Sequence, residues 1–159
     1  MVFVHGGSNR SGWSFEPNYH GHRLAAEGAV VVSIAYRLGV FGFFSHPDLV
    51  AQPVAANFGL WDQLAALRWI QRNIARFGGD PQRVTVFGES AGAGNIAMLM
   101  VAPQARGLLH RAIVQSGGDF AWVAIERHLA GLHIGIAANP VEAGFHPQRR
   151  EHQPLDQPI

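Results

Sequence analysis

The sequence predicts an α/β fold in which a central parallel sheet carries helices on both of its faces. Short apolar runs with the length of strands alternate along the chain with longer segments of helical period. These runs are apolar on both sides, which is typical of strands in a parallel sheet that helices cover. The chain shows no internal repeat, and its 159 residues fit one domain of ordinary size.

Four runs have the apolar, β-branched character of buried strands. They are residues 1–5, 29–35, 83–87 and 112–114. Three segments between or after these strands predict helices, at residues 20–27, 57–77 and 91–101. Residues 37–56 mix glycine, proline and aromatic residues without a clean period, and we expect an ordered excursion there.

The helix over residues 57–77 has the clearest pattern. Its apolar residues recur every three or four positions and predict a single buried stripe. They are Leu60, Leu64, Leu67, Ile70, Ile74 and Phe77. Gly78-Gly79 and then Asp80-Pro81 end this helix and turn the chain.

The character of the sequence changes after Gly118. Residues 119–137 are compatible with a further helix, but apolar periodicity is lost from about residue 138 and proline becomes frequent. We therefore divide the chain into a core at residues 1–118 and a diverged or poorly ordered segment at 119–159. A shifted reading frame is an alternative source of that segment.

Composition excludes several classes of function. The net charge of +1 indicates neither a nucleic acid nor an anionic membrane as a partner, and no apolar run approaches the roughly 20 residues of a membrane-spanning helix. The absence of cysteine excludes disulfides and thiolate chemistry. We expect no metal and no cofactor. The opening residues do not form a signal peptide, so a cytoplasmic location is favoured, although the compartment stays unknown.

The stretch "VTVFGESAGAG", residues 84–94, carries the strongest chemical signal. It predicts a sharp strand-to-helix turn that holds the Ser90 hydroxyl clear of the backbone, as a nucleophilic serine requires. Such a turn crowds the second positions on either side of the serine, which are Gly88 and Gly92. A serine without function and a phosphate-binding loop are the alternatives. Against the phosphate loop, the chain has no lysine and lacks the glycine spacing of a dinucleotide site.

A second motif, His5-Gly6-Gly7-Ser8, follows the first strand. Glycines at this place let backbone N–H groups approach a substrate without an intervening side chain. Alone the motif is compatible with an ordinary turn. Together with the serine turn some 80 residues later, it predicts a site that stabilises an oxyanion.

The sequence resembles the catalytic core of the type-B carboxylesterases, the family that includes the cholinesterases. The resemblance covers most of residues 1–118 in order and spacing. It is carried by "FVHGG", "VVVSIAYRLGVFGF", "NFGLWDQLAALRWIQRNIARFGGDP", "RVTVFGESAG" and "GLLHRAIVQSGG".

The resemblance implies an α/β-hydrolase fold with Ser90 as the nucleophile. It also implies an oxyanion hole formed by the N–H groups of Gly7, Ser8 and Ala91. Ser8 departs from the glycine or alanine that is usual in the family, and its hydroxyl can narrow the site. Glu89 is implied to be a buried structural carboxylate and not the acid of the triad.

The histidine and the acid that would complete a triad with Ser90 are not recognisable. In α/β-hydrolases the order along the chain is serine, acid, histidine. The acids after Ser90 are Asp119, Glu126, Glu142, Glu151 and Asp156, and the histidines are His110, His128, His133, His146 and His152. None lies in a family-like context for this role, and His110 is expected to be structural. We expect the chain to be a fragment of a longer protein, cut at both ends.

Two functions follow from these motifs. The first is a serine hydrolase that cleaves small carboxylic esters through an acyl-enzyme on Ser90. The second is a catalytically inactive remnant or a binding or adhesion protein of the same family. Phe120 and Trp122 are candidates for an acyl pocket, with a role as ordinary core or surface aromatics as the alternative. We also expect exposed sheet edges to permit self-association.

Overall fold

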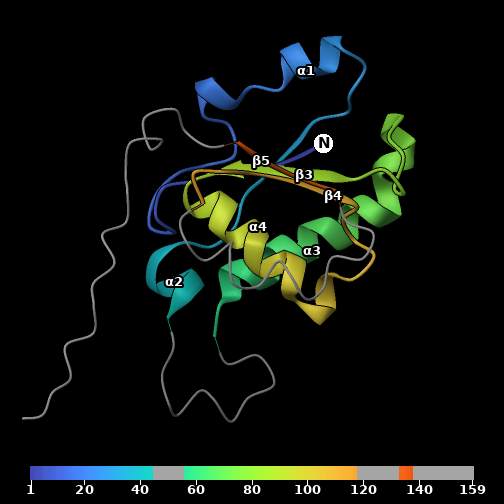
Figure 1. The fold of residues 1–159 in the computed structure, drawn as a ribbon. Coiled ribbons are helices and arrows are strands. Elements are labelled where there is room, and N and C mark those ends of the chain that lie inside the picture. The colour runs from blue at the N-terminus through green and yellow to red at the C-terminus, as the bar shows by residue number, and fades with distance from the viewer. Residues whose placement is uncertain (45–55, 118–132, 138–159) are drawn as a thin grey trace, which may run out of the picture.

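The computed structural model describes residues 1–44 and 56–117 and the backbone of residues 133–137. Five strands form one sheet in the order β2-β1-β3-β4-β5, and each neighbouring pair is parallel (Figure 1). The strands are β1 (Val2–Val4), β2 (Val32–Ile34), β3 (Thr85–Glu89), β4 (Arg111–Gln115) and β5 (His133–Ala137). The predicted parallel sheet and its four predicted strands are confirmed.

The register of the sheet brings the two predicted motifs to one edge. Val4 of β1 pairs with Gly88 of β3, and Glu89 pairs with Gln115 of β4. Because parallel strands point the same way, the residues that follow β1 and β3 emerge at the same carboxyl edge. These residues are the His5-Gly6-Gly7 segment and Ser90.

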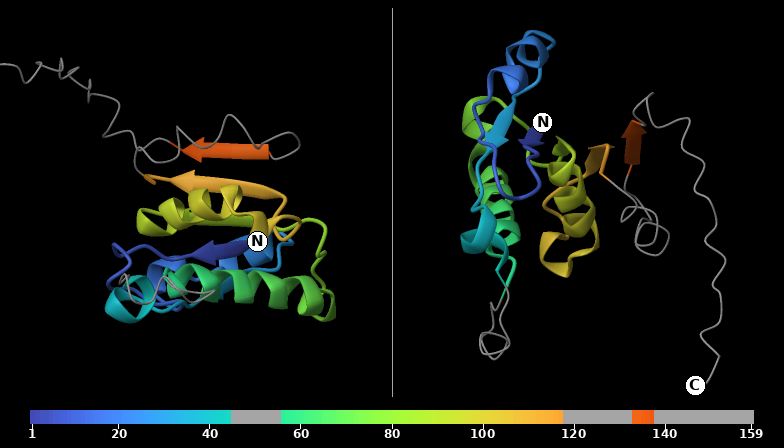
Figure 2. Two further views of the ribbon diagram at one scale, coloured as in Figure 1. Left: turned by 90° about the horizontal axis from the view of Figure 1, so that it is seen from below. Right: turned by 90° about the vertical axis from the view of Figure 1, so that its left-hand side faces the viewer.

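Helices cover both faces of the sheet, as predicted. The helices are α1 (His22–Ala26), α2 (Gly39–Phe43), α3 (Phe58–Asn73) and α4 (Ala91–Val101), with 3₁₀ turns at Pro17–Tyr19, Ile74–Phe77 and Pro103–Ala105. Figures 1 and 2 show α3 and α4 side by side on one face and α1 on the other. Helix α4 packs against β1, β3 and β4, and this contact places its amino end at the carboxyl edge of the sheet.

The stripe predicted for α3 is correct in its middle and wrong at its end. Leu64, Leu67, Ile70 and Ile74 are buried, but Phe77 is 61% exposed. The α-helix ends at Asn73 and continues as a 3₁₀ turn, which rotates later side chains away from the stripe. Gln63 is fully buried on this helix, and neither polar atom of its amide has a partner among the described residues.

The fifth strand was not predicted. Residues 119–137 are compatible with a helix by composition, but residues 133–137 form β5, which pairs with β4 along its whole length. A run as short as "HIGIA" cannot be assigned to a helix or a strand from the period of its apolar residues. Its two isoleucines favour a strand. The domain boundary at residue 118 stays a prediction. In the described ranges, no helix has both the length and the apolar character that crossing a bilayer requires.

An ion pair ties the end of β2 to α3. The Nε and Nη2 groups of Arg37 donate to the two carboxylate oxygens of Asp62 at 2.7 Å each, and the Arg37 backbone N–H also donates to Asp62 at 2.9 Å. The guanidinium lies over the Phe58 ring, 5.1 Å from its centroid. These hydrogen bonds lower the pKa of Asp62 from its ordinary value.

We expect the stabilising effect of Asp62 to disappear in acid. Since folding lowers the pKa of this carboxyl, its contribution to stability is fully present above the unfolded pKa of about 3.9. It is lost as the pH falls through the lower folded pKa. In thermal melting at neutral pH, the melting temperature of wild type should be higher than that of Asp62→Asn. The difference between the two melting temperatures should shrink below about pH 3.9. A difference that stays constant down to acid unfolding would contradict the assignment.

Candidate active site

Ser90 is held in a strained backbone conformation between β3 and α4. It is the N-cap of α4, with φ 54° and ψ −125°. For a residue other than glycine, this backbone conformation costs on the order of 1–3 kcal/mol of conformational free energy. Its N–H donates to the Gln115 carbonyl at 2.9 Å, and its carbonyl accepts from the Gly94 N–H at 3.0 Å. The Ser90 residue is partly exposed. These bonds hold the turn in the form that a nucleophile requires.

The two glycines of this turn lie against the end of β1. A Cβ on Gly88 would lie 2.5 Å from the Val4 carbonyl oxygen and 3.0 Å from Ile96 Cδ1. A Cβ on Gly92 would lie 2.6 Å from the His5 carbonyl oxygen and even closer to that of Val4. The sequence predicted crowding at both positions. The structure shows that the neighbouring strand causes much of it.

The segment after β1 reaches Ser90 directly. We call residues 5–11 the oxyanion loop. A Cβ on Gly6 would lie 3.2 Å from Ser90 Cβ and 2.9 Å from the Glu89 carbonyl oxygen, so the loop touches the serine turn. Glu89, expected to be a buried carboxylate, is only half-buried. Burial is the larger cause that raises the pKa of Tyr19, and the negative charge of Glu89 is the next. The Glu89 carboxylate therefore faces this tyrosine.

His5 orients the first peptide of the oxyanion loop. The ring is buried and stacked on Tyr36 at 4.4 Å, and its Nδ1 lies 2.9 Å from the Gly6 carbonyl oxygen. Because a carbonyl only accepts, Nδ1 carries the proton and donates it. All described peptides are trans, so the N–H of Gly7 points opposite to this carbonyl, away from the His5 ring. His5 therefore acts as a scaffold for the loop.

Tyr36 supports the same loop from β2. Burial raises the pKa of its phenol to about 12, so the hydroxyl stays protonated at neutral pH. It donates to the His5 carbonyl at 2.7 Å. Tyr36 was not singled out from the sequence, because a tyrosine after a buried strand is most often a core residue.

The second peptide of the loop is oriented by a tight turn. The Gly7 carbonyl accepts from the N–H groups of Arg10 at 2.9 Å and Ser11 at 3.0 Å. The N–H of Ser8 shares this peptide and therefore points the opposite way. Gly7 and Ser8 both have positive φ, at 101° and 55°, and Ser8 is exposed. That its hydroxyl narrows the site stays a prediction.

The third peptide belongs to the serine turn. Because the Ser90 carbonyl is bonded inside α4, the N–H of Ala91 points out of the amino end of that helix. Within the described residues, the N–H groups of Gly7, Ser8 and Ala91 donate to no acceptor. Three N–H groups without a described partner thus lie on two touching segments, and the dipole of α4 places partial positive charge at its amino end, beside Ser90.

Two histidines that follow Ser90 lie at the other end of the sheet. The Nδ1 of His110 accepts from the Val84 N–H at 3.3 Å, just before β4, and His133 begins β5 in register with Arg111. At about 3.3 Å per residue, this end is some 20 Å from Ser90. Neither histidine can act on Ser90 from there.

The remaining candidates for the triad lie outside the described residues, as do the two acyl-pocket aromatics. They are Asp119, Glu126, Glu142, Glu151, Asp156, His128, His146, His152, Phe120 and Trp122. Among the residues that are described, no three His, Cys, Asp or Glu side chains gather as metal ligands would.

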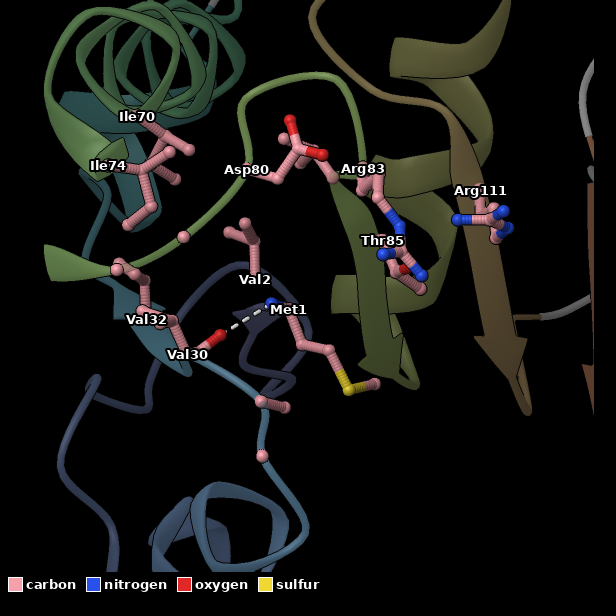
Figure 3. Close-up of a pocket in the computed structure, with 15 residues that line it drawn as sticks. Met1, Val2, Val30, Val32, Ile70, Ile74, Asp80, Arg83, Thr85 and Arg111 are labelled. Carbon is pink, nitrogen blue, oxygen red and sulfur yellow. Dashed lines mark hydrogen bonds between the residues drawn. The ribbon is translucent and has the colours of Figure 1, made fainter.

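A cavity of about 320 Å³ lies away from this site, at the amino ends of the strands (Figure 3). Ile70 of α3 and Ile74 of the 3₁₀ turn after it line one side, and Arg83 and Arg111 line the other. The terminal ammonium of Met1 donates to the Val30 carbonyl at 2.6 Å within it. Because Ser90 follows the carboxyl end of β3, this cavity takes no part in its chemistry.

Comparisons with known proteins match this chain to an esterase family. The family model described as the carboxylesterase family matches residues 1–142. The chain is similar to the fumonisin B1 esterase of Sphingopyxis macrogoltabida, with 47% identity over 85% of this chain and 26% of the relative. It is also similar to the para-nitrobenzyl esterase of Bacillus subtilis, with 52% identity over 75% of this chain and 24% of the relative.

A solved structure of PNB esterase matches with a TM-score of 0.67 and 50% identity, over 72% of this chain and 24% of that structure. This likeness confirms the predicted fold class. The chain thus spans about a quarter of the length of the relatives that it matches.

Proposed function

Because the chain belongs to the carboxylesterase family, we propose that it carries the nucleophile and the oxyanion hole of an enzyme that hydrolyses carboxylic esters. The observation that carries this proposal is the group of three unpaired N–H groups, on Gly7, Ser8 and Ala91, beside a strained serine. All three residues are half-buried or exposed, so a bound substrate can reach these N–H groups. They suit an ester carbonyl that becomes an oxyanion.

In the proposed reaction, Ser90 Oγ attacks the ester carbonyl carbon while its proton passes to a general base. The carbonyl oxygen becomes an oxyanion that accepts hydrogen bonds from the three N–H groups. The carbon–oxygen bond to the alcohol then breaks, and the alcohol leaves with a proton from the protonated base. Water attacks the acyl-enzyme by the same steps and releases the carboxylic acid and Ser90. The base and its acid are not among the described residues near Ser90.

The substrate class is a small carboxylic ester. A para-nitrobenzyl esterase and a liver carboxylesterase are among the relatives that share about half of their aligned residues with this chain. The second candidate function is a non-catalytic member of the family. The lack of a described triad histidine favours it, whereas the strained Ser90 backbone and both glycines of the turn favour the enzyme.

A fluorophosphonate probe tests the proposal, because it reacts only with an activated serine. We expect the folded chain, alone or within a longer polypeptide that contains it, to be labelled on the peptide that carries Ser90. Ser90→Ala should abolish the label, and a para-nitrobenzyl ester should compete with it. Mass spectrometry of the digest reads the modified residue. Absence of label in both forms would contradict the enzyme and favour the non-catalytic member.

A further inference from the structure

Two asparagines far apart in the sequence are hydrogen-bonded to each other beside the proposed oxyanion hole, and the Tyr36 hydroxyl contacts both side chains. Asn9 directly follows Ser8, and Asn95 lies on α4, which begins just after Ser90. The Asn95 Nδ2 group donates to Asn9 Oδ1 at 2.8 Å, and the Asn9 Nδ2 group donates to Asn95 Oδ1 at 3.2 Å. Each amide thus serves the other as both donor and acceptor, across a separation of 86 residues.

The pair is anchored on both sides. Asn95 is only 4% exposed, so loss of Asn9 would remove both of these bonds from a buried amide and leave it the Tyr36 hydroxyl. Asn9 has φ 57°, a conformation that asparagine tolerates better than most residues. Its carbonyl accepts from the Gly39 N–H at 2.6 Å, where α2 begins. Its side chain is therefore the link from the oxyanion loop to α4, and its backbone is the link to α2.

The oxyanion loop depends on such links because much of it is open to solvent. Ser8, Arg10 and Ser11 are exposed, and the N–H groups of Gly7 and Ser8 have no partner among the described residues. Gly6 touches the serine turn before these two peptides, and Asn9 is held immediately after them. The two contacts bracket the peptides that would bind the oxyanion.

We propose that Asn9 and Asn95 are a positioning pair, which holds the N–H groups of Gly7 and Ser8 at a fixed distance from Ser90. The proposal rests on the proposed function of those groups. Neither asparagine touches the reacting atoms. Because Asn95 and Ser90 belong to the same turn-and-helix unit, movement of the loop relative to Ser90 requires the pair to break. A misplacement of about 1 Å in such a site can cost on the order of 100-fold in rate.

Asn9→Gly and Asn95→Ala in the full chain test the pair. Glycine at position 9 keeps the positive φ without strain. Its matched control is Asn57→Gly, since Asn57 has the same φ of 57° and makes no side-chain cap bond. Asn73→Ala is the control for Asn95→Ala, because it removes another helical amide, bonded to the Trp69 carbonyl at an exposed position.

The first readout is the rate of Ser90 labelling by a fluorophosphonate as a function of probe concentration. We expect each variant to lower the maximal rate by roughly 10- to 100-fold with little change in the half-saturating concentration. The double variant should be no worse than either single one, because both break the same contact. Asn9→Asp should recover only part of the rate, because it keeps the acceptor for Asn95 Nδ2 but replaces the donor to Asn95 Oδ1 with a carboxylate oxygen. Equal rates in Asn9→Gly and Asn57→Gly would overturn the proposal.

Amide NMR of the same proteins provides the second readout, which does not depend on catalysis. Asn95→Ala should shift and broaden the resonances of Gly7 and Ser8, and Asn73→Ala should leave them unchanged. If wild type is labelled neither alone nor within a longer polypeptide but these resonances respond, the positioning role stands and the proposed function fails. If they do not respond, the positioning role is wrong whether or not Ser90 is labelled.

Discussion

We expect Gly92→Ala to lower the free energy of unfolding by about 3 kcal/mol or more. A Cβ at this position would overlap the carbonyl oxygens of Val4 and His5, which belong to the end of β1 and cannot rotate away. Gly92 is itself buried, at the start of α4. Relief would require α4 to move off the sheet and to carry Ser90 with it. Since ordinary domains are stable by only about 5–15 kcal/mol, much of the native population would be lost.

Gly94→Ala is the matched control for this substitution. Gly94 lies in the same helix, two residues after Gly92. The nearest atom to a Cβ at this position would be the Gly117 carbonyl oxygen, at an ordinary van der Waals distance of 3.6 Å. We expect it to raise stability by about 0.5–1 kcal/mol, because alanine favours a helix over glycine. Urea unfolding followed by circular dichroism measures both variants. Equal stability of the two would show that β1 and α4 do not meet as described.

The second large effect is expected at Gly7. Its φ is 101°, and a Cβ would overlap the carbonyl of Ser11, the residue whose N–H donates to the Gly7 carbonyl and closes the turn of the oxyanion loop. We expect Gly7→Ala to displace the N–H groups of Gly7 and Ser8 and to slow labelling of Ser90 by on the order of 10²–10³, the effect of losing an oxyanion donor. The sheet should still form, because residues 7–11 of this loop are half-buried or exposed and follow the end of β1.

Gly107→Ala separates this effect from backbone strain alone. Gly107 also has positive φ, at 76°, but a Cβ there would meet nothing within 4 Å. It should cost about 1 kcal/mol of stability without slowing the labelling of Ser90. If Gly7→Ala is labelled at the same rate as Gly107→Ala, the N–H groups of the oxyanion loop do not bind the oxyanion.

Much of this arrangement could be predicted from local sequence. Apolar runs predict the first four strands, and the three or four-residue spacing of leucine and isoleucine predicts the middle of α3. The glycines around Ser90 predict its turn because no other residue fits there. These signals lie within a few residues of the feature that they predict.

The features that were missed depend on contacts that form only in the folded chain. Asn9 and Asn95 form hydrogen bonds across 86 positions, and nothing in either neighbourhood indicates a partner. Gln63 is buried although an amide predicts a solvent-facing position. The orientation of the Gly7 and Ser8 peptides follows from bonds made by His5, Arg10 and Ser11, which only folded backbone geometry reveals.

The central claim is that Ser90 attacks an ester whose oxyanion is bound by the N–H groups of Gly7, Ser8 and Ala91. A crystal structure of the protein after reaction with a fluorophosphonate tests it most directly. The claim predicts a covalent bond from Ser90 Oγ to phosphorus, with the phosphonyl oxygen about 2.7–3.1 Å from those three nitrogens. A phosphonyl oxygen turned away from them, or attachment to a residue other than Ser90, would contradict it.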